Sequence, residues 1–286
     1  MLFPRLKRAF DQAKFQLRIW SVLRSGPPFR SRLDRIIIDL THECDLACLD
    51  CNRSCGAGQA PAAESIGLEQ VRRFVDESLA AGKSWRRIML EGGEPTLHPQ
   101  LDGIIAELLR YRRHGHAECE IELCSNGYGP QAARTLSRLP AGVRAKNSAK
   151  TSDPRRGHFS FNVAPIDLDG FAAADFAQGC YIHPLFGLGL TRAGYYPHPI
   201  CAGIDRVFGF DIGLKKLPAA AEELAAQMRR LCPLCGHFRE FRAHGGRRPR
   251  FWRRFSPGGF PPGSRSRSWE RAYRGFRDQP PVLTPY

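Results

Sequence analysis

The sequence predicts an α/β fold in which helices cover a mainly parallel sheet, followed by a small module rich in cysteine. Two observations predict the first part. Short runs of β-branched residues alternate with segments of helical periodicity between residues 35 and 165, and polar motifs directly follow several of the runs. Strands separated by helices are typical of βα units around a parallel sheet. After about residue 170 the alternation ends and cysteines recur, which indicates a second module.

Size and composition are those of an ordinary globular protein. The chain has 286 residues, of which 42% are hydrophobic and 25% are charged. It contains no apolar run of about eighteen residues and no apolar signal segment at its start, so we expect a cytoplasmic protein without a membrane span. In a reducing compartment its ten cysteines are metal or redox ligands more readily than disulfides.

Residues 1–30 are expected to form an N-terminal amphipathic helix that ends before Gly-Pro-Pro at 26–28. Apolar side chains recur at alternating gaps of three and four, which corresponds to one face of a helix (Phe3, Leu6, Phe10, Ala13, Leu17 and Trp20). We expect this face to pack against the rest of the chain or a partner. A membrane surface is the alternative, because lysine and arginine lie on the opposite side.

Residues 31–170 contain the strand and helix signals of the sheet. The expected strands are the runs at 36–40, 87–90, 120–124, 143–147 and 159–163, and the expected helices are 68–79, 101–111 and 131–139. Functional groups gather at the carboxyl ends of parallel strands. We therefore expect motifs that follow different strands to meet at one rim.

The most informative motif follows the first strand, where Cys44, Cys48 and Cys51 are separated by three and two residues. A four-iron cluster normally takes four protein ligands, so three thiolates leave one iron open. An open metal position binds a substrate or cofactor. Two further motifs follow later strands, Gly-Gly-Glu-Pro at 92–95 and Ser-Asn-Gly at 125–127.

In this order, the three motifs resemble the signature of the radical S-adenosylmethionine (radical SAM) enzymes over roughly residues 34–165. The resemblance implies a partial (β/α)6 TIM-like barrel and a [4Fe–4S] cluster on the three cysteines. It also implies S-adenosylmethionine (SAM) at the open iron, with cofactor contacts from the strand-end motifs (Gly92, Gly93, Glu94, Ser125 and Asn126). In such enzymes SAM is cleaved to a 5′-deoxyadenosyl radical that abstracts hydrogen from the substrate.

Two positions depart from the family's pattern. Asp50 precedes the third cysteine, where the family usually has an aromatic residue near the adenine, so that side of the pocket must be built differently. Cys55 could act as a fourth ligand and close the cluster. Ferredoxin-type runs, however, have a first gap of two and a proline after the last cysteine, whereas here the first gap is three and Gly56 follows.

Residues 171–242 carry a second group of cysteines (Cys180, Cys201, Cys232 and Cys235). The group resembles the short auxiliary-cluster module called twitch, a relative of the SPASM module, which implies a second [4Fe–4S] cluster. A four-thiolate zinc site is the alternative, and His198 could replace Cys201 as a ligand. The remaining thiols, Cys119 and Cys124, flank a strand and are expected to be buried in the core.

Within this second module we expect a hairpin at 188–197, with Gly194 at its turn, and an amphipathic helix at 217–231. Polar and aromatic side chains in and near the module are candidate substrate contacts (His158, Asp167, Asp169, Tyr195, Tyr196, Asp205 and Arg206). The pattern does not single out a catalytic residue among them.

Residues 243–286 are expected to form a basic, partly disordered tail in which only 268–277 has helical character. Much of the net charge of +15 lies at the two ends of the chain, since residues 239–286 alone carry twelve arginines against three acids. Basic ends can contact nucleic acid or acidic lipid, although a solvated surface is the simpler interpretation.

The leading hypothesis is a radical SAM oxidoreductase or tailoring enzyme that abstracts hydrogen from a small molecule or peptide. An electron donor such as flavodoxin or ferredoxin is the implied partner, and an auxiliary cluster that accepts the substrate electron suits a net oxidation. One alternative is an activating enzyme for a glycyl-radical partner protein. Another is a non-catalytic iron–sulfur or zinc protein that binds nucleic acid through its basic ends.

Overall fold

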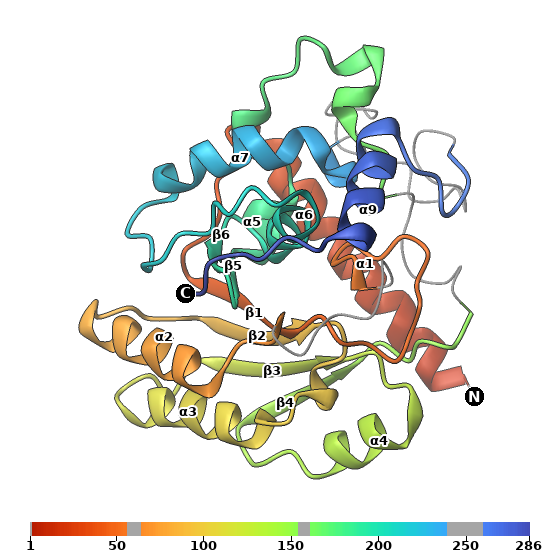
Figure 1. Cartoon of the computed structure of the whole chain (residues 1–286). Helices are drawn as coiled ribbons and strands as arrows, with labels where there is room; N and C mark the ends of the chain where they lie inside the picture. Colours follow the sequence, from red (N-terminus) through yellow and green to blue (C-terminus); the bar gives the residue numbers. More distant parts are fainter. Residues whose placement is uncertain (1, 56–63, 154–160, 239–259) are drawn as a thin grey trace.

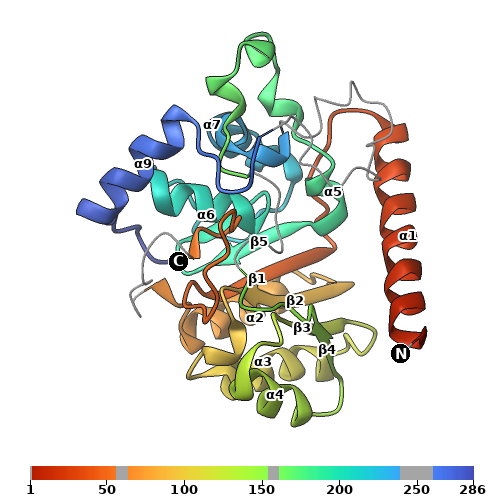
Figure 2. The same ribbon diagram turned by 90° about the vertical axis from the view of Figure 1, so that its right-hand side faces the viewer.

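The computed structural model describes residues 2–55, 64–153, 161–238 and 260–286 (Figures 1 and 2). At its centre is a six-stranded sheet with the order β4-β3-β2-β1-β5-β6. Neighbouring strands are parallel except for β5 and β6, which form the expected antiparallel hairpin. The strands are β1 (Arg35–Thr41), β2 (Arg87–Gly92), β3 (Glu120–Ser125), β4 (Val143–Asn147), β5 (Leu188–Thr191) and β6 (Gly194–Tyr196).

Helices connect the first four strands, which confirms the predicted α/β class. They are α2 (Leu68–Ala80), α3 (Leu101–Arg113) and α4 (Gly129–Ser137), and their bounds lie within two residues of the expected ones. α2 and α3 form helices because their apolar side chains recur every three or four residues, and those side chains are buried.

The two faces of this sheet differ in polarity, because successive side chains of a strand point to opposite sides. Ile36, Ile38 and Leu40 of β1 belong to the apolar core that includes the buried faces of α2 and α3. Asp39 lies between them in sequence and therefore points to the other face, as do Glu91 of β2 and Glu122 of β3. One face of the sheet is therefore apolar, whereas the other carries these charged side chains beside Ile37 and Met89.

After β4 the chain crosses to the opposite edge of β1. β5 pairs in parallel with β1, with Ile36 opposite Leu188 and Ile38 opposite Leu190. The sheet is therefore continuous across the boundary expected at residue 170. The fifth strand lies beside β1 and not beside β4, so the strand order departs from a sequential (β/α)6 series.

The C-terminal half forms a second apolar core above the β5–β6 end of the sheet (Figure 1). It contains four buried cysteines together with the aromatic side chains Trp269, Tyr273 and Phe276. The helices around it are α5 (Ile182–Phe186), α6 (Pro199–Phe208), α7 (Ala225–Leu231) and α9 (Arg267–Asp278).

Helix α1 spans Leu2–Ser25 as expected, but the face predicted to pack is exposed in the described residues. Phe10 is 69% exposed and Leu17 is 65% exposed. The C-terminal turns of α1 reach the body (Figure 2), where Ile19 is buried in the C-terminal core. No helix of the described residues is long and apolar enough to span a bilayer.

Two predicted elements are wrong in part. Residues 161–163 form a turn and not a strand, while residues 159–160 lie outside the described part. The alternation of apolar residues there reflects burial of Phe161 against Trp269. The helix expected at 217–231 begins only at Ala225, after the 3-10 turn Ala221–Leu224. Pro218 disfavours helical backbone at Leu217, and the Glu223 carboxylate accepts from the backbone N–H groups of Ala219 and Ala220 at 2.9 Å, which caps the 3-10 turn.

Helix α9 confirms the helical character expected at 268–277. Its apolar side chains Trp269, Tyr273 and Phe276 recur at gaps of four and three and are all buried, so residues 260–286 belong to the folded body. Residues 243–259 lie outside the described part, and the expected partial disorder of the tail stays a prediction there. The Asp167 carboxylate accepts hydrogen bonds from the backbone N–H and hydroxyl of Ser268, at 2.9 and 2.7 Å, and fixes the first turn.

Replacing Trp269 with alanine is expected to destabilise the protein by about 3–5 kcal/mol, the usual cost of deleting a buried aromatic side chain. The indole is fully buried and donates to the Leu234 carbonyl at 2.9 Å. Urea unfolding followed by circular dichroism measures the effect. Trp20→Ala, which removes a partly exposed indole, is the matched control and is expected to cost less than about 1 kcal/mol. Equal losses for the two variants would contradict the docking of α9.

Candidate functional site

The three strand-end motifs meet at one cavity of about 220 Å³ at the carboxyl ends of β1, β2 and β3. Seven of the residues expected at the site line it (Cys44, Cys48, Cys51, Gly92, Gly93, Ser125 and Asn126). Further lining residues come from the cysteine loop and from β2, β3 and the end of β4 (Leu46, Asn52, Arg53, Cys55, Glu91, Cys124, Lys146, Ser148 and Lys150). The parallel sheet thus brings together segments about 80 residues apart in the chain.

The cysteine loop follows β1 and turns sharply after the third cysteine. Ser54 has a positive φ of 56° and its N–H donates to the Cys51 carbonyl at 3.0 Å, which places Cys55 beside Cys51. A hydrogen bond from the Cys55 thiol lowers the pKa of Cys51 to about 5, against the opposing effect of burial. Burial raises the pKa of Cys44 to about 11. Cys51 is therefore the thiol that most readily supplies a thiolate.

Gly92 and Gly93 allow the end of β2 to lie directly against the cysteine loop. A Cβ atom on Gly93 would lie 2.1 Å from the Glu43 carbonyl oxygen, and one on Gly92 would lie 2.3 Å from that of Thr41. Gly92 also has a φ of +130°, which side chains rarely adopt. The glycines are thus required by packing of backbone on backbone, a reason that the sequence pattern alone does not reveal.

Glu94 does not line the cavity, although the motif suggested that it contacts the cofactor. Its carboxylate is fully buried and accepts four hydrogen bonds, from the backbone N–H and hydroxyl of Thr96, the hydroxyl of Ser125 and the backbone N–H of Asn126, at 2.7–3.1 Å. The side chain therefore joins the end of β2 to the end of β3. Only its backbone remains close to the glycines that face the cavity.

Asn126 links β3 to the cysteine loop. Its side-chain amide donates to the Asp45 carboxylate at 2.7 Å and lies 4.0 Å from the Cys44 sulfur. Its carbonyl oxygen accepts from the backbone N–H of Tyr128 at 2.6 Å, which fixes the orientation of the amide. Asn126 is thus placed to hold the first cysteine in position.

A buried ion-pair network beneath the cysteine loop is absent from the sequence-based expectations. Arg53 donates to Asp39 at 3.2 Å and to Glu91 at 2.8 Å. Burial raises the pKa of Asp39 to about 6, although the Arg53 guanidinium opposes the shift. The sequence does contain one signal that could have revealed this network: Asp39 is an acidic residue within the otherwise apolar run Ile-Ile-Ile-Asp-Leu.

Two lysines and the Cys124 thiol also line the cavity, although the sequence analysis did not expect them there. Lys146 is the next-to-last residue of β4 and Lys150 follows the strand, so both cations lie at the β4 side of the cavity, across β3 and β2 from β1. Cys124, expected to be a core thiol, is half-buried and lines the cavity, because it lies on the polar face of β3. Cys119 is buried in the core as expected.

Asp50 connects the cysteine loop to the C-terminal segment. Its buried carboxylate accepts from the backbone N–H of Gly263 at 2.8 Å. Nearby, the Ser54 hydroxyl lies 3.0 Å from the phenol oxygen of Tyr273 on α9. The position that is usually aromatic in the family thus carries a hydrogen-bond acceptor that binds a segment more than 200 residues away.

The second group of cysteines gathers in the C-terminal core. Cys180, Cys201, Cys232 and Cys235 are all buried. Burial raises the pKa of Cys201 and of Cys232 well above the usual range, and repulsion from the other thiolates of the group adds to both shifts. Four such thiols cannot all ionise together unless a metal compensates their charge.

His198 lies beside this group but is already used as a helix cap. Its Nδ1 accepts from the backbone N–H of Ile200 at 3.2 Å, which puts the ring proton on Nε2 when the imidazole is neutral. That tautomer has no lone pair left on Nε2 for a metal, so the geometry favours Cys201 over His198. His183 also lies beside the thiols, with Nε2 3.8 Å from the Cys232 sulfur.

Within the described residues, no three His, Cys, Asp or Glu side chains are arranged to hold a single metal ion. The other candidate contacts have internal roles: the Tyr196 hydroxyl donates to Asp205 at 2.7 Å and the Tyr195 hydroxyl donates to Glu77 at 3.0 Å. Asp167 caps α9, Asp169 starts a 3-10 turn, and His158 lies outside the described residues.

Comparison with known proteins gives partial matches. No family model matches the chain. The GTP 3′,8-cyclase of Rhodopseudomonas palustris (strain TIE-1) is 31% identical over 129 residues, which are 44% of this chain and 36% of that protein. The GTP 3′,8-cyclase of Bradyrhizobium diazoefficiens is 30% identical over 151 residues, which are 51% of this chain and 42% of that protein. The match thus spans less than half the length of these curated relatives.

Among solved structures, BtrN in complex with AdoMet and 2-DOIA is similar with a TM-score of 0.42 and 11% identity. The similarity covers 72% of this chain and 94% of that chain.

Glu94→Gln is expected to lower the stability by about 1–3 kcal/mol, because a glutamine cannot accept all four hydrogen bonds and presents an unpaired donor to buried groups. Urea unfolding measures the loss, and iron content after anaerobic reconstitution should fall with it. Glu118→Gln, at an exposed position, is the matched control and should match the wild type in both. A Glu94→Gln protein of unchanged stability would contradict the joining role.

Acidification is expected to destabilise the fold between about pH 6.5 and pH 4. Burial lowers the pKa of His183 to about 4 and holds the pKa values of His42 and His198 well below the usual range. The unfolded chain therefore binds more protons than the native one as the pH falls, and each such histidine costs about 1.4 kcal/mol per pH unit in this window. Asp39, with its raised pKa, acts in the opposite direction.

Variants separate the contribution of the buried histidines to the pH dependence of stability from the contribution of Asp39. Urea unfolding of His183→Gln at pH 7, 6 and 5 should show a shallower pH dependence than the wild type. His114→Gln, at an exposed position, should leave it unchanged. Equal slopes for His183→Gln and the wild type would refute the assignment.

Proposed function

We propose that this chain, which belongs to the radical SAM superfamily, holds a [4Fe–4S] cluster on Cys44, Cys48 and Cys51 and binds SAM beside it. One observation carries the proposal. The three cysteines share a single cavity with the backbone of Gly92 and Gly93, so a ligand of the open iron would lie against the end of β2. The donor set fits, since the three thiols of the motif would leave one iron position free. Cys55 lines the same cavity and its thiol donates to Cys51, so the proposal assigns it as a hydrogen-bond donor and not as a fourth ligand.

The chemistry that the cluster and SAM supply, when bound, is one-electron cleavage of a carbon–sulfur bond of SAM, which yields methionine and a 5′-deoxyadenosyl radical that abstracts hydrogen from the substrate. The protein's part is to bind and orient. The lowered pKa of Cys51 favours a thiolate at one corner, and Asn126 holds the loop at Cys44. Lys146 and Lys150 provide positive charge for the carboxylate of SAM at the β4 side of the cavity.

The second group of cysteines is proposed to hold an auxiliary [4Fe–4S] cluster. Burial of all four thiols in one core supports this assignment, and the capping role of His198 supports Cys201 as the fourth ligand. Such a cluster would accept the electron that remains on the substrate, so the reaction would be a net oxidation. A four-thiolate zinc site is the competing assignment, which metal analysis separates from it.

The substrate is proposed to be a small organic molecule or a peptide, with flavodoxin or ferredoxin as the electron donor. The curated relatives are named for a reaction of GTP, but the match covers only part of their length. The decisive experiment is anaerobic reconstitution followed by iron counting, electron paramagnetic resonance and assay of 5′-deoxyadenosine under dithionite. About eight irons per chain would support two clusters and about four would support one. A wild-type protein that holds its clusters and forms no 5′-deoxyadenosine would refute the proposal.

Cys48→Ala is expected to lose 5′-deoxyadenosine formation and about four irons, because it removes a ligand of the cluster beside SAM. Cys235→Ala should lose a similar amount of iron but retain some SAM cleavage. Cys119→Ala is the matched control: this thiol is buried outside both groups, and the variant should keep the iron and product of the wild type. Loss of product in Cys119→Ala, or its retention in Cys48→Ala, would contradict the assignment.

A further inference from the structure

A second cavity, of about 130 Å³, lies at the carboxyl ends of β1 and β5, on the same rim as the cysteine loop. Its walls come from five parts of the chain that are distant in sequence, one of which is Glu64 before α2. His42 follows β1, Arg192 follows β5, Arg206 extends from α6, and the C-terminal segment crosses the opening with residues 280–283.

Two polar side chains in this cavity are buried without full hydrogen bonding. His42 is 5% exposed, and neither ring nitrogen makes a hydrogen bond of normal geometry with the described residues, although the ring lies close to the Glu64 backbone. Arg206 is 3% exposed and its Nε lacks a partner there too. Buried donors without acceptors are costly, so a ligand that offers acceptor oxygens would be favoured at this position.

The charge of the lining favours an anion of low charge. Arg206 forms an ion pair with Glu64, and Arg192 adds a second guanidinium. The described lining therefore has two cations and one anion, with a formal charge of +1. A planar carboxylate matches the fork of a guanidinium, whereas a doubly charged phosphate would be repelled by Glu64.

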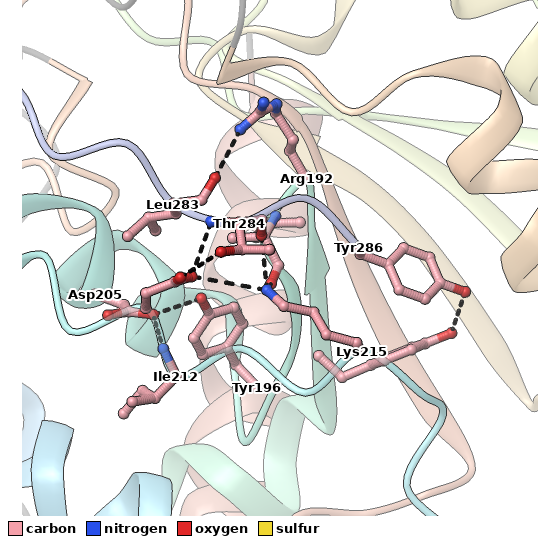
Figure 3. A network of polar contacts seen from close by, with 12 residues as sticks. Arg192, Tyr196, Asp205, Ile212, Lys215, Leu283, Thr284 and Tyr286 are labelled. Carbon is pink, nitrogen blue, oxygen red and sulfur yellow. Dashed lines mark hydrogen bonds and ion pairs between the residues drawn. The ribbon is translucent and has the colours of Figure 1, made fainter.

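The remaining lining is apolar and held in place. Ala193, Ala202, Pro281 and Leu283 contribute this surface. The C-terminal segment is tied to β5 and to the segment after α6: Arg192 donates to the Leu283 carbonyl at 3.2 Å, and Lys215 donates to the Thr284 carbonyl at 2.7 Å (Figure 3). At its end, the Tyr286 hydroxyl donates to Glu77 at 2.9 Å. The cavity is thus a built site with a polar end and an apolar wall.

This cavity adjoins the cysteine loop. Arg206 donates to the Ser54 carbonyl at 3.1 Å, and a Cβ atom on Gly203 of α6 would lie 3.1 Å from the Cα of Arg53. The residues between Cys51 and Cys55 therefore form the wall between the two cavities. A group bound beside Arg206 would lie next to the site at which SAM is proposed to bind.

We propose that this second cavity is a carboxylate-binding subsite, which receives the carboxylate end and adjoining short apolar part of the organic substrate. Arg192 and Arg206 bind the carboxylate oxygens, the His42 ring donates to one of them, and Ala202 contacts the apolar part. The assignment to the substrate rests on the proposed radical SAM function. The binding chemistry itself does not.

Ligand-observed NMR titration of the full-length, cluster-loaded protein tests the subsite with butyrate, butyramide and inorganic phosphate as probes. Butyrate should bind saturably and at least about tenfold more tightly than butyramide, since a charge-assisted hydrogen bond is lost in the amide. Arg192→Gln should weaken butyrate binding about tenfold. Ala202→Leu, which fills the cavity, should abolish it.

Arg138→Gln, an exposed arginine at the end of α4, is the matched control and should bind butyrate as the wild type does. Iron content and circular dichroism verify that each variant is folded. Equal affinity for butyrate and butyramide, tighter binding of phosphate, or unaltered binding by folded Ala202→Leu would each overturn the proposal. A wild type that binds butyrate in this pattern but makes no 5′-deoxyadenosine would leave the subsite standing and refute the proposed function.

Discussion

The functional end of the sheet depends on one buried carboxylate. Glu94 accepts four hydrogen bonds from Thr96, Ser125 and Asn126, and so joins the carboxyl ends of β2 and β3. Asn126, held in this way, donates to Asp45 in the cysteine loop. Backbone hydrogen bonds from Gly93 to Thr41 and from Glu94 to Glu43 complete the link to β1. The position of the three cysteines thus depends on contacts between three strands and not on the loop alone.

The cysteine loop is also held from its other side by the C-terminal half. Asp50 accepts from Gly263, Ser54 lies within hydrogen-bond distance of Tyr273, and Arg206 donates to the Ser54 carbonyl. The loop is therefore enclosed between the sheet on one side and α6, α9 and the segment before α9 on the other. Such enclosure would limit water and oxygen near a reduced cluster, which radical chemistry requires. It also means that the two halves form one continuous structure.

Local pattern was sufficient for much of the fold but not for contacts between distant segments. The strands and helices up to β4 follow from periodicity, and the meeting of three motifs at one rim follows from parallel strands. The return of β5 to the edge of β1 has no local signal, because pairing partners are chosen by tertiary packing. The same holds for Asp50 and Gly263, which are more than 200 residues apart. Phe10 and Leu17 show the opposite error, in which a local pattern predicted burial that the structure does not have. An apolar stripe on a helix becomes a buried face only where a partner surface covers it.

The net charge of +15 says little about the site, because the charges that matter there are local. A cluster with three thiolate ligands is a buried anion, which needs compensating cations nearby. Arg53 lies in the wall of the cavity, yet Asp39 and Glu91 already pair with it. Lys146 and Lys150 are the other cations that line this cavity, and both would add positive charge near the proposed cluster and the SAM carboxylate. The basic ends of the chain account for much of the high total, whereas a ligand of this cavity would meet the charges of these few lining side chains.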